Sequence, residues 1–373
     1  MKLVFWLSLL LIFYAYVGYA LWLALLAKFQ SRPVHRGIFL PRVSVIMAAH
    51  NEEANLQAKL ENLRTLNFPP EKLQIIVVSD GSTDRTLEIL EREGRNGSFL
   101  PIMLPEPRGK AIALNTAVRH ATGEVLVFFD VRQQVDRDAV TELCSCLNDI
   151  EVGAVSGELL LEDALGRPAG DALGLYWRIE KLVRRLESQT GSVVGVTGAI
   201  YAMRRELYRD LPAGTILDDV LVPMNVARAG KRVVFQPSAR ARDRIFTATG
   251  KEFTRKARTL TGNYQLIALA PWLLSPSNPI LFRLVSHKLL RLAVPFLLVA
   301  VLVSSVAAQG TFYRVALILQ LLFYGLAVVG WIKPATRKFR SVAVAETFTM
   351  LNLAAAVALY NFAIGRKNIW VRS

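Results

Sequence analysis

Uncharged apolar runs lie at both ends of the chain. The first, Leu3–Ala27, has 25 residues, is rich in leucine and aromatic residues, and is followed by Lys28. A helix that crosses a bilayer needs about 20 apolar residues, whereas the apolar part of a cleaved signal peptide usually has about 7 to 15 and precedes a small-residue cleavage site. Because no clear site of that kind precedes the polar segment that follows, we expect an uncleaved membrane anchor.

Three further uncharged runs lie towards the other end of the chain, at Leu292–Tyr313, Val315–Ile332 and Thr347–Gly365. The loop Lys333–Arg340 carries four basic residues, and basic residues gather in the cytoplasmic loops of membrane proteins. Counting back across two spans, this predicts a cytoplasmic location for the centre of the chain. Counting forward puts the basic C-terminal residues outside, which the same rule disfavours. Either the last run is not a full crossing or the tail is an exception.

Between residues 41 and 250, short β-rich runs alternate with helix-like segments, which is typical of an α/β domain. We expect strands at Val43–Ala48, Ile75–Ser79, Val125–Phe129 and Val233–Gln236. We expect helices at Asn55–Leu66, Asp84–Glu93, Ala111–Ala121 and Asp138–Leu147. This central segment is long enough for one well-buried domain.

Composition and the distribution of charge indicate a membrane protein and not a nucleic-acid-binding one. Hydrophobic residues make up 53% of the chain and charged residues 20%, against about 45–50% and about 25% in soluble domains, which favours a membrane protein. The net charge of +15 first suggests a nucleic-acid partner, but residues 41–250 carry −2 and the flanks +17. The excess charge therefore points to lipid headgroups, and we expect no nucleic-acid partner. Two cysteines, Cys144 and Cys146, cannot form a disulfide framework.

Polar residues directly follow three of the predicted strands. His50–Glu53 follow the first strand, Asp80 and Gly81 the second, and Asp130 the third. Ligands of open α/β sheets bind outside the carboxyl ends of the strands, so three such clusters predict one shared site. For Ser79–Asp84 the alternative is a turn that caps the next helix.

These clusters resemble the nucleotide-sugar domain of the family 2 glycosyltransferases. The matching motifs, in chain order, are HNEE at His50–Glu53, SDGSTD at Ser79–Asp84, GKAIALN at Gly109–Asn115, the Asp130 that ends VLVFFD, the pair Asp218-Asp219, and RxxRT at Arg255–Thr259. Membrane-bound members include the synthases of cellulose, hyaluronan and poly-N-acetylglucosamine. The resemblance covers about residues 40–265 and implies a GT-A-like, Rossmann-like mixed sheet. We therefore expect an anchor at 1–28, a cytoplasmic glycosyltransferase domain at 40–250, interfacial helices at 251–285 and transmembrane helices at 286–373.

The resemblance also implies roles for individual residues. A nucleoside diphosphate sugar, by analogy a UDP-sugar, is the implied donor. The residues implied to line its cleft are His50, Asn51, Glu52, Asp80, Gly81, Lys110, Asp130 and Arg132. Asp219, beside Asp218, is the implied general base of an inverting displacement, which needs a single base. The alternatives are a solvated Lys110 and an N-cap role for one of the two aspartates.

The metal motif of the family is incomplete in this chain. The family's D-x-D reads Asp130-Val131-Arg132 here, so the second carboxylate is missing. One hypothesis is that Asp130 alone holds a divalent ion, Mg or Mn, with more water in the shell, which Mg²⁺ tolerates. The other is that Arg132 contacts the diphosphate directly with its guanidinium fork.

The acceptor side departs from the family as well. Arg255, Arg258 and Gly262 match the spacing of the family's QxxRWxxG, with Arg255 in place of Gln and Thr259 in place of Trp. That Trp lies near the acceptor sugar in polymerising members, so its absence puts processive synthesis in doubt. The alternative for Lys251–Arg258 is an amphipathic segment on anionic headgroups. Gly198–Ala202 resembles the strand that borders the acceptor, or is simply a buried strand.

The function expected from these residues is that of a multi-pass enzyme of the cell membrane. It would move a sugar from a nucleoside diphosphate sugar to a growing polysaccharide or glycolipid. One alternative is transfer of a single sugar to a polyprenyl phosphate. A more distant alternative is a transporter or a nucleotide-binding membrane protein without turnover, but residues 292–332 carry only one charged residue, Arg314, where transporters place ionisable groups inside their spans.

Overall fold

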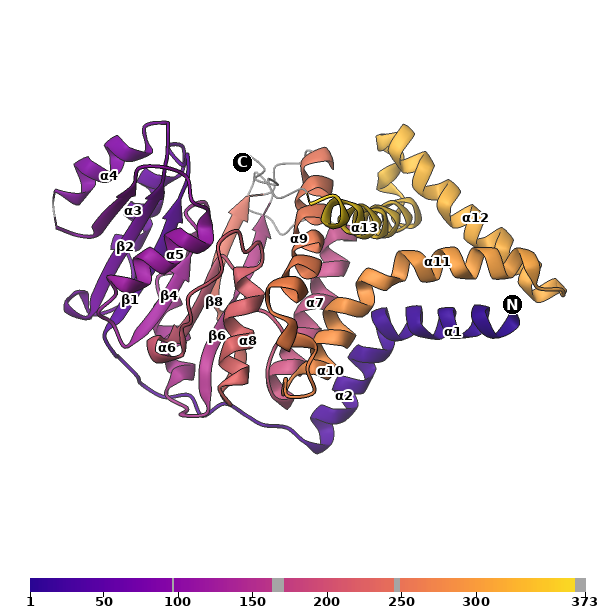
Figure 1. The fold of residues 1–373 in the computed structure, drawn as a ribbon, viewed down its shortest axis with the longest axis horizontal. Helices are drawn as coiled ribbons and strands as arrows, with labels where there is room; N and C mark the ends of the chain where they lie inside the picture. The colour runs from indigo at the N-terminus through magenta and orange to yellow at the C-terminus, as the bar shows by residue number, and fades with distance from the viewer. Residues whose placement is uncertain (96, 163–170, 245–248, 366–373) are drawn as a thin grey trace.

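The computed structural model consists of an α/β domain joined to a group of long helices (Figure 1). It describes residues 1–95, 97–162, 171–244 and 249–365. Within these residues the α/β domain has one eight-stranded sheet, in the order β3-β2-β1-β4-β7-β6-β8-β5. The strands are β1 (Val43–Ala49), β2 (Leu73–Asp80), β3 (Leu100–Leu104), β4 (Val125–Phe129), β5 (Gln134–Val135), β6 (Val152–Glu162), β7 (Ile200–Arg204) and β8 (Arg232–Arg244).

Parallel pairing brings the functional loops to one edge of the sheet. β1 lies between β2 and β4 and is parallel to both, with Val43 opposite Leu73 and Val125. The carboxyl ends of β1, β2 and β4 therefore lie side by side. β7 then runs antiparallel to both β4 and β6, so the sheet is mixed, as expected. Since β4 is apolar and buried along its whole length, it is covered on both faces.

Helices cover both faces of this sheet. The helices of the domain are α3 (Leu56–Arg64), α4 (Thr86–Gly94), α5 (Lys110–Arg119), α6 (Ala139–Leu147), α7 (Asp171–Thr190), α8 (Asp218–Arg228) and α9 (Thr249–Leu269). One apolar cluster joins the strands to Leu114 of α5, Val222 of α8 and Leu266 of α9. The other joins them to α3, α4 and α6. Successive strand residues point to opposite faces, so Ile46 enters the first cluster and Val45 the second.

The predicted elements are present. All four expected strands and all four expected helices are found, with ends that differ by a few residues at most, apart from the last strand. The run Val233–Gln236 is part of the much longer β8. Cys144 and Cys146 are buried and unpaired. The strands that the sequence did not predict include β3 and β6.

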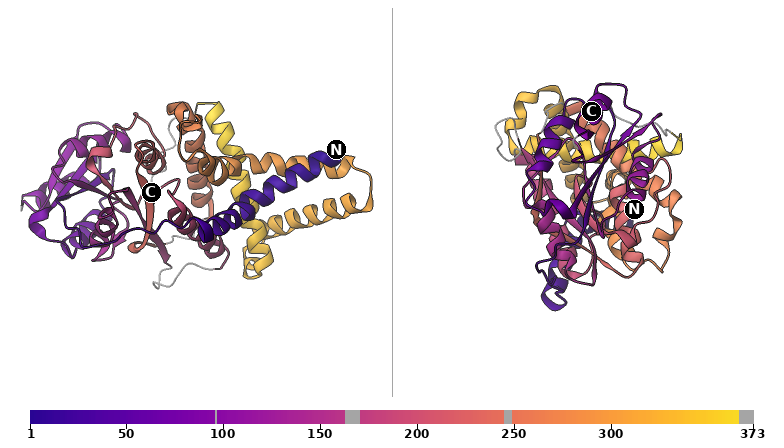
Figure 2. Two further views of the ribbon diagram at one scale, coloured as in Figure 1. Left: turned by 90° about the horizontal axis from the view of Figure 1, so that it is seen from below. Right: turned by 90° about the vertical axis from the view of Figure 1, so that its left-hand side faces the viewer.

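The described residues contain four helices that are long and apolar enough to cross a membrane. They are α1–α2 (Lys2–Phe29), α10–α11 (Leu281–Ala307), α12 (Thr311–Ile332) and α13 (Arg340–Ala363). In Figures 1 and 2, α1, α11 and α12 extend away from the sheet, whereas α13 runs across their direction, between them and the α/β domain. Phe5 of α1 packs against Val301 of α11 and Tyr313 of α12.

Candidate active site

Asp80 fixes the loop that begins α5. Its buried carboxylate, at the end of β2, accepts the backbone N–H groups of Arg108 at 2.7 Å and Gly109 at 2.8 Å. The next residue, Gly81, has φ of +61°, and a Cβ there would lie 2.3 Å from the backbone nitrogen of Pro107. Only glycine fits both the left-handed conformation and this close approach. The loop thus lies across the strand ends and delivers α5 to the site.

The loop after β1 is joined to the loop after β2. His50 Nδ1 lies 2.7 Å from the carbonyl oxygen of Asp80, and Asn51 Oδ1 accepts the N–H of Thr83 at 2.8 Å. Asn51 itself adopts the left-handed conformation, with φ of 56°, which asparagine tolerates better than most residues. Burial raises the pKa of the Glu52 carboxyl. The loops after β1 and β2 therefore form one side of the candidate site together.

Lys110 joins carboxylates from two other elements. Its Nζ lies 3.0 Å from Oδ1 of Asp130, after β4, and 3.4 Å from Oδ2 of Asp218, at the start of α8. The Lys110 side chain is only 29% exposed, so the alternative of a solvated lysine is wrong. Burial lowers the pKa of Lys110, but the charges of Asp130 and Asp218 outweigh it, and the net shift is upward. Lys110 is therefore a fixed positive charge at the centre of the site.

Asp218 and Asp219 form the first turn of α8. The residue before them, Leu217, is the N-cap, and in the described structure no side-chain bond caps this helix, so the capping alternative is not supported. Asp219 is half-buried, and its Oδ1 is a buried atom without a hydrogen-bond partner among the described residues. Burial, and then the charge of Asp218, raise the pKa of Asp219 to about 6. A carboxylate that titrates near neutral pH suits a general base.

Arg132 is held by a residue that the sequence reading missed. Its guanidinium lies 2.5 Å from Oδ2 of Asp243 on β8, and the same oxygen accepts the side-chain amide of Gln133 at 3.1 Å. Arg132 contributes to the charge felt by Glu52, so it lies on the expected side of the sheet. It is already neutralised by Asp243, which limits what it can offer to a diphosphate.

A second residue that was missed is Lys59 of α3. It is fully buried, its Nζ donates to the carbonyl oxygen of Gln133 at 2.6 Å, and it lies 4.8 Å from the ring centroid of Phe129. Burial lowers the pKa of Lys59 to about 7, while the charge of Asp130 opposes this. Lys59 thus contacts the residues on both sides of Asp130, namely Phe129 and Gln133. A lysine in the middle of an amphipathic helix carries no signal that distinguishes it from a solvated one.

The residues near Asp130 could hold a divalent ion with few protein ligands. Among the described residues, no three His, Cys, Asp or Glu side chains gather as a metal site. Asp130 is 37% exposed, and Lys110 already contacts one of its oxygens. An ion bound here would therefore take Asp130 and complete its shell with diphosphate oxygens and water, as Mg²⁺ commonly does.

The side of the site at which the sequence predicts the acceptor is formed by α9 and β7. Burial lowers the pKa of Arg258, and the charge of Asp218 opposes this. Arg255 is on the exposed side of α9. At Gly262, a Cβ would lie 2.7 Å from Cγ of Leu217. This absence of a side chain lets α9 approach the segment that leads into α8.

The strand expected at Gly198–Ala202 is β7, with its start shifted to Ile200. Tyr201 stacks on Phe128 with a centroid distance of 4.5 Å, and its buried hydroxyl has no hydrogen-bond partner in the described part of the chain. A Cβ on Gly198 would lie 3.5 Å from Cβ of Asp219. Small residues thus leave room beside the proposed base.

The mixed sheet, with its linked loops after β1 and β2, has a GT-A-like fold. At the ends of its strands, a lysine lies between two carboxylates and beside an aspartate of raised pKa. Residues 44–212 match the family model described as Glycosyl transferase family 2. The chain therefore contains a segment that matches family 2 glycosyltransferases, as the sequence motifs predict. The match ends before the acidic pair of α8, so the roles of that pair rest on geometry.

Similar proteins agree with this assignment. The probable glycosyltransferase YdaM of Bacillus subtilis is 29% identical over 54% of this chain and 50% of its own length. The poly-β-1,6-N-acetyl-D-glucosamine synthase of Staphylococcus aureus is 25% identical over 61% of this chain and 56% of its own. The chain thus spans about half the length of these curated relatives. The mannosyltransferase PcManGT of Pyrobaculum calidifontis, solved with GDP-Man and Mn²⁺, has the same fold, with a TM-score of 0.73 at 24% identity over 97% of this chain and 99% of its own.

Proposed function

We propose that this chain is an integral membrane glycosyltransferase that transfers a sugar, with inversion, from a nucleoside diphosphate sugar to a glycan or lipid-linked acceptor. The observation that carries the proposal is the contact of Lys110 with both Asp130 and Asp218, next to Asp219. This group puts positive charge and a base of raised pKa at the carboxyl ends of the strands, where nucleotide ligands of such sheets bind.

The proposed chemistry needs a charge and a base on opposite sides of the sugar. The acceptor oxygen forms a bond to the anomeric carbon while the bond from that carbon to the diphosphate breaks and its electron pair leaves with the diphosphate. Asp219 takes the acceptor proton. Lys110 stabilises the negative charge that builds on the diphosphate. One attack from the face opposite the leaving group inverts the configuration.

A divalent ion, Mg or Mn, bound at Asp130 would supply further charge for the leaving diphosphate. The solved neighbour was obtained with GDP-Man and Mn²⁺, which supports an ion in this fold. We expect excess chelator to abolish sugar transfer and added Mg²⁺ or Mn²⁺ to restore it. Full turnover in chelator, measured as diphosphate release, would leave Lys110 and Arg132 as the source of the charge.

One experiment with a panel of labelled donors tests both the identity of the donor and the kind of product. A UDP-sugar is the proposed donor by analogy with the synthases that the sequence resembles, and the GDP-Man of the solved neighbour makes GDP-sugars the matched comparison. We expect purified protein in lipid to release diphosphate from one labelled donor of the panel. Label in high-molecular-weight material would indicate polymer synthesis, and label in solvent-extractable lipid would indicate a lipid acceptor. Release from no donor would contradict the proposal.

A polyprenyl phosphate acceptor remains a second candidate. Arg258 lies on α9, and its guanidinium feels the charge of Asp218. A guanidinium is well suited to a phosphate.

We also propose that three of the four apolar helices cross the membrane and that α13 lies along its cytoplasmic surface. α13 runs across the direction of α1 and α11 (Figures 1 and 2), and its Phe362 stacks on Tyr264 of α9 with a centroid distance of 5.8 Å. Its buried Glu346 pairs with Arg337 at 2.6 Å. This placement removes the conflict in the charge count, because the basic residues after α13, which lie outside the described residues, then stay in the cytoplasm.

Reporter fusions test this topology. We expect green fluorescent protein fused after Ser373 to fluoresce, because it stays in the cytoplasm, and alkaline phosphatase at the same position to be inactive. The control is a fusion at Gly310, between α11 and α12, where the phosphatase is expected to be active. Phosphatase activity after Ser373 would show that α13 crosses the membrane.

A further inference from the structure

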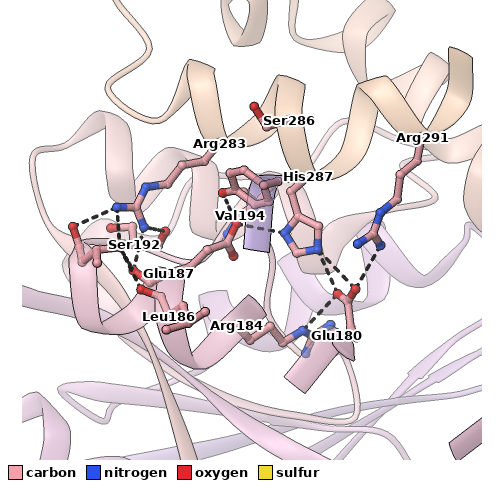
Figure 3. Close-up of polar contacts among 12 residues, drawn as sticks. Glu180, Arg184, Leu186, Glu187, Ser192, Val194, Arg283, Ser286, His287 and Arg291 are labelled. Atoms are coloured by element: carbon pink, nitrogen blue, oxygen red, sulfur yellow. Dashed lines mark hydrogen bonds and ion pairs between the residues drawn. The ribbon is translucent and has the colours of Figure 1, made fainter. Parts of the chain in front are cut away.

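A buried polar network joins the catalytic domain to the first C-terminal membrane helix. Glu180 and Glu187 of α7 lie on either side of His287, at 3.2 Å and 2.9 Å from its ring nitrogens (Figure 3). Tyr19 of α2 donates to Glu187 at 2.7 Å. Arg291 donates to Glu180 at 3.0 Å. The network therefore fixes the cytoplasmic end of α10–α11 against α7.

The cations at this junction have partners in the protein. Arg184 contacts Glu180 at 3.4 Å and donates to Oγ1 of Thr197 at 2.8 Å. Arg283 donates to three backbone carbonyl groups, one of them that of Glu187 at 2.6 Å (Figure 3). These contacts, like that of Arg291, use the positive charges to hold the helices together.

Lys288 is the exception. It follows His287 in the π-helical segment η5 (Val285–Leu289) and is half-buried. In the described structure its ammonium has neither a hydrogen bond nor an ion pair. Its ammonium is therefore available to a ligand from outside the chain.

The Lys288 side chain extends towards Asp219. A Cβ added to Gly195 would lie 3.9 Å from Cε of Lys288 and 3.4 Å from the backbone oxygen of Asp219, so both atoms are close to one point. The charge of Lys288 also favours the ionised form of Asp219. The two groups nevertheless form no ion pair within 4.0 Å in the described structure, so Asp219 does not occupy the ammonium of Lys288.

Other polar atoms on this side of the site also lack partners. Oδ1 of Asp219 and the hydroxyl of Tyr201 are both buried and have no hydrogen-bond partner among the described residues. Buried polar atoms without partners are rare in proteins and call for a bound water or ligand. They are a second sign, independent of Lys288, that a polar ligand belongs next to Asp219.

We propose that Lys288 binds the phosphate of a lipid acceptor and holds it beside Asp219. The proposal rests on the proposed transferase function and narrows its acceptor to a lipid phosphate monoester. Lys288 lies in the helix Leu281–Ala307, near the start of a candidate membrane span, so its charge is available at headgroup depth. A phosphate oxygen would form the bond to the anomeric carbon, the bond to the diphosphate would break, and the proton of the hydrogen phosphate would pass to Asp219.

The test compares two lysine variants of the full-length protein in lipid vesicles. Lys288→Met removes the charge and keeps the length of the side chain. Lys28→Met is the matched control, since Lys28 is exposed at the end of the first membrane helix. With a short-chain prenyl phosphate, we expect Lys288→Met to raise the acceptor KM by about 10- to 100-fold, as for the loss of a charged hydrogen bond. Lys288→Arg should recover most of the affinity, and Lys28→Met should match the wild type.

Donor hydrolysis in the absence of acceptor separates the outcomes, because it reports an intact fold and donor site. An unchanged acceptor KM in Lys288→Met would overturn the proposal, as would a lower kcat alone, which would make Lys288 only a counter-ion of Asp219. Inorganic phosphate that competes as well as prenyl phosphate would show a site for free phosphate. Diphosphate release with all label in a glycan would reject the lipid phosphate and leave the transferase function standing, whereas no release from any donor would reject the function itself.

Discussion

Asp219→Asn is expected to lower the rate of sugar transfer by about 10²- to 10⁴-fold, the usual contribution of a positioned general base. Asparagine has nearly the same shape but cannot take the proton of the acceptor. Nucleotide affinity should be unchanged, because Lys110 keeps its contacts with Asp130 and Asp218. The measurements are turnover by diphosphate release and nucleotide binding by calorimetry.

The control for this variant is Asp210→Asn, which makes the same chemical change in a surface ion pair with Arg119. It should leave turnover unchanged, because exposed ion pairs contribute little. Ordinary turnover in Asp219→Asn would refute the role of the base.

The pH dependence gives a second readout for Asp219. The pKa of this carboxyl is raised to about 6, so kcat/KM of the wild type should fall as the pH drops through about 6 and the base becomes protonated. The same shift has a consequence for stability. A carboxyl whose pKa is raised by folding costs stability as the pH rises from about 4 to about 6. Asp219→Asn avoids this cost, so at pH 7 the variant should be no less stable than the wild type.

Lys110→Met is expected to reduce kcat by about 10²- to 10³-fold, which is typical of removing one group that stabilises developing negative charge. It also leaves the buried carboxylate of Asp218 without its partner, so the melting temperature should fall. The control is Lys231→Met, in which a half-buried lysine outside the site loses a bond to a backbone carbonyl. Its kinetics and melting temperature should stay close to those of the wild type.

A shift in the pH profile distinguishes Lys110 from a purely structural lysine. The charge of Lys110 favours the ionised form of Asp219, so its removal should raise the pKa of Asp219. The acid limb of the profile would then move to a pH above that of the wild type. Lys110→Arg, which keeps the charge, should leave the limb in place. If turnover falls but the limb does not move in Lys110→Met, the proposed proximity of the two groups is wrong.

Much of the fold could be predicted because the signals are local. The run Val125–Phe129 is apolar and ends at Asp130, and the structure has β4 with the same bounds. The long uncharged runs of the four apolar helices were equally clear. The strand β6 was not predicted, because its glycines interrupt the apolar pattern. A helix beginning at Asp218 was expected, but two carboxylates at its start suggested a cap, and the structure shows both in the first turn instead.

Partnerships between distant residues could not be predicted. Asp243 lies 111 residues after Arg132 in the chain, and no periodicity indicates that β8 brings it to the end of β4. His287 and Glu187, which are partners in a buried network, are 100 residues apart in the chain. The direction of α13 was also invisible in the sequence, because its composition resembles that of a spanning helix.

The sequence thus established which segments are strands, which are apolar helices, and which polar residues follow the strands, since these depend on neighbours within a few positions. It also contained motifs that resemble those of the family 2 glycosyltransferases. Three contacts are visible only in the tertiary structure: Lys110 lies between two carboxylates, Arg132 is neutralised by Asp243, and Lys288 lies near Asp219 but forms no ion pair with it. Burial and charge pairing arise when segments far apart in the chain pack together, and a pattern along one segment contains no record of them.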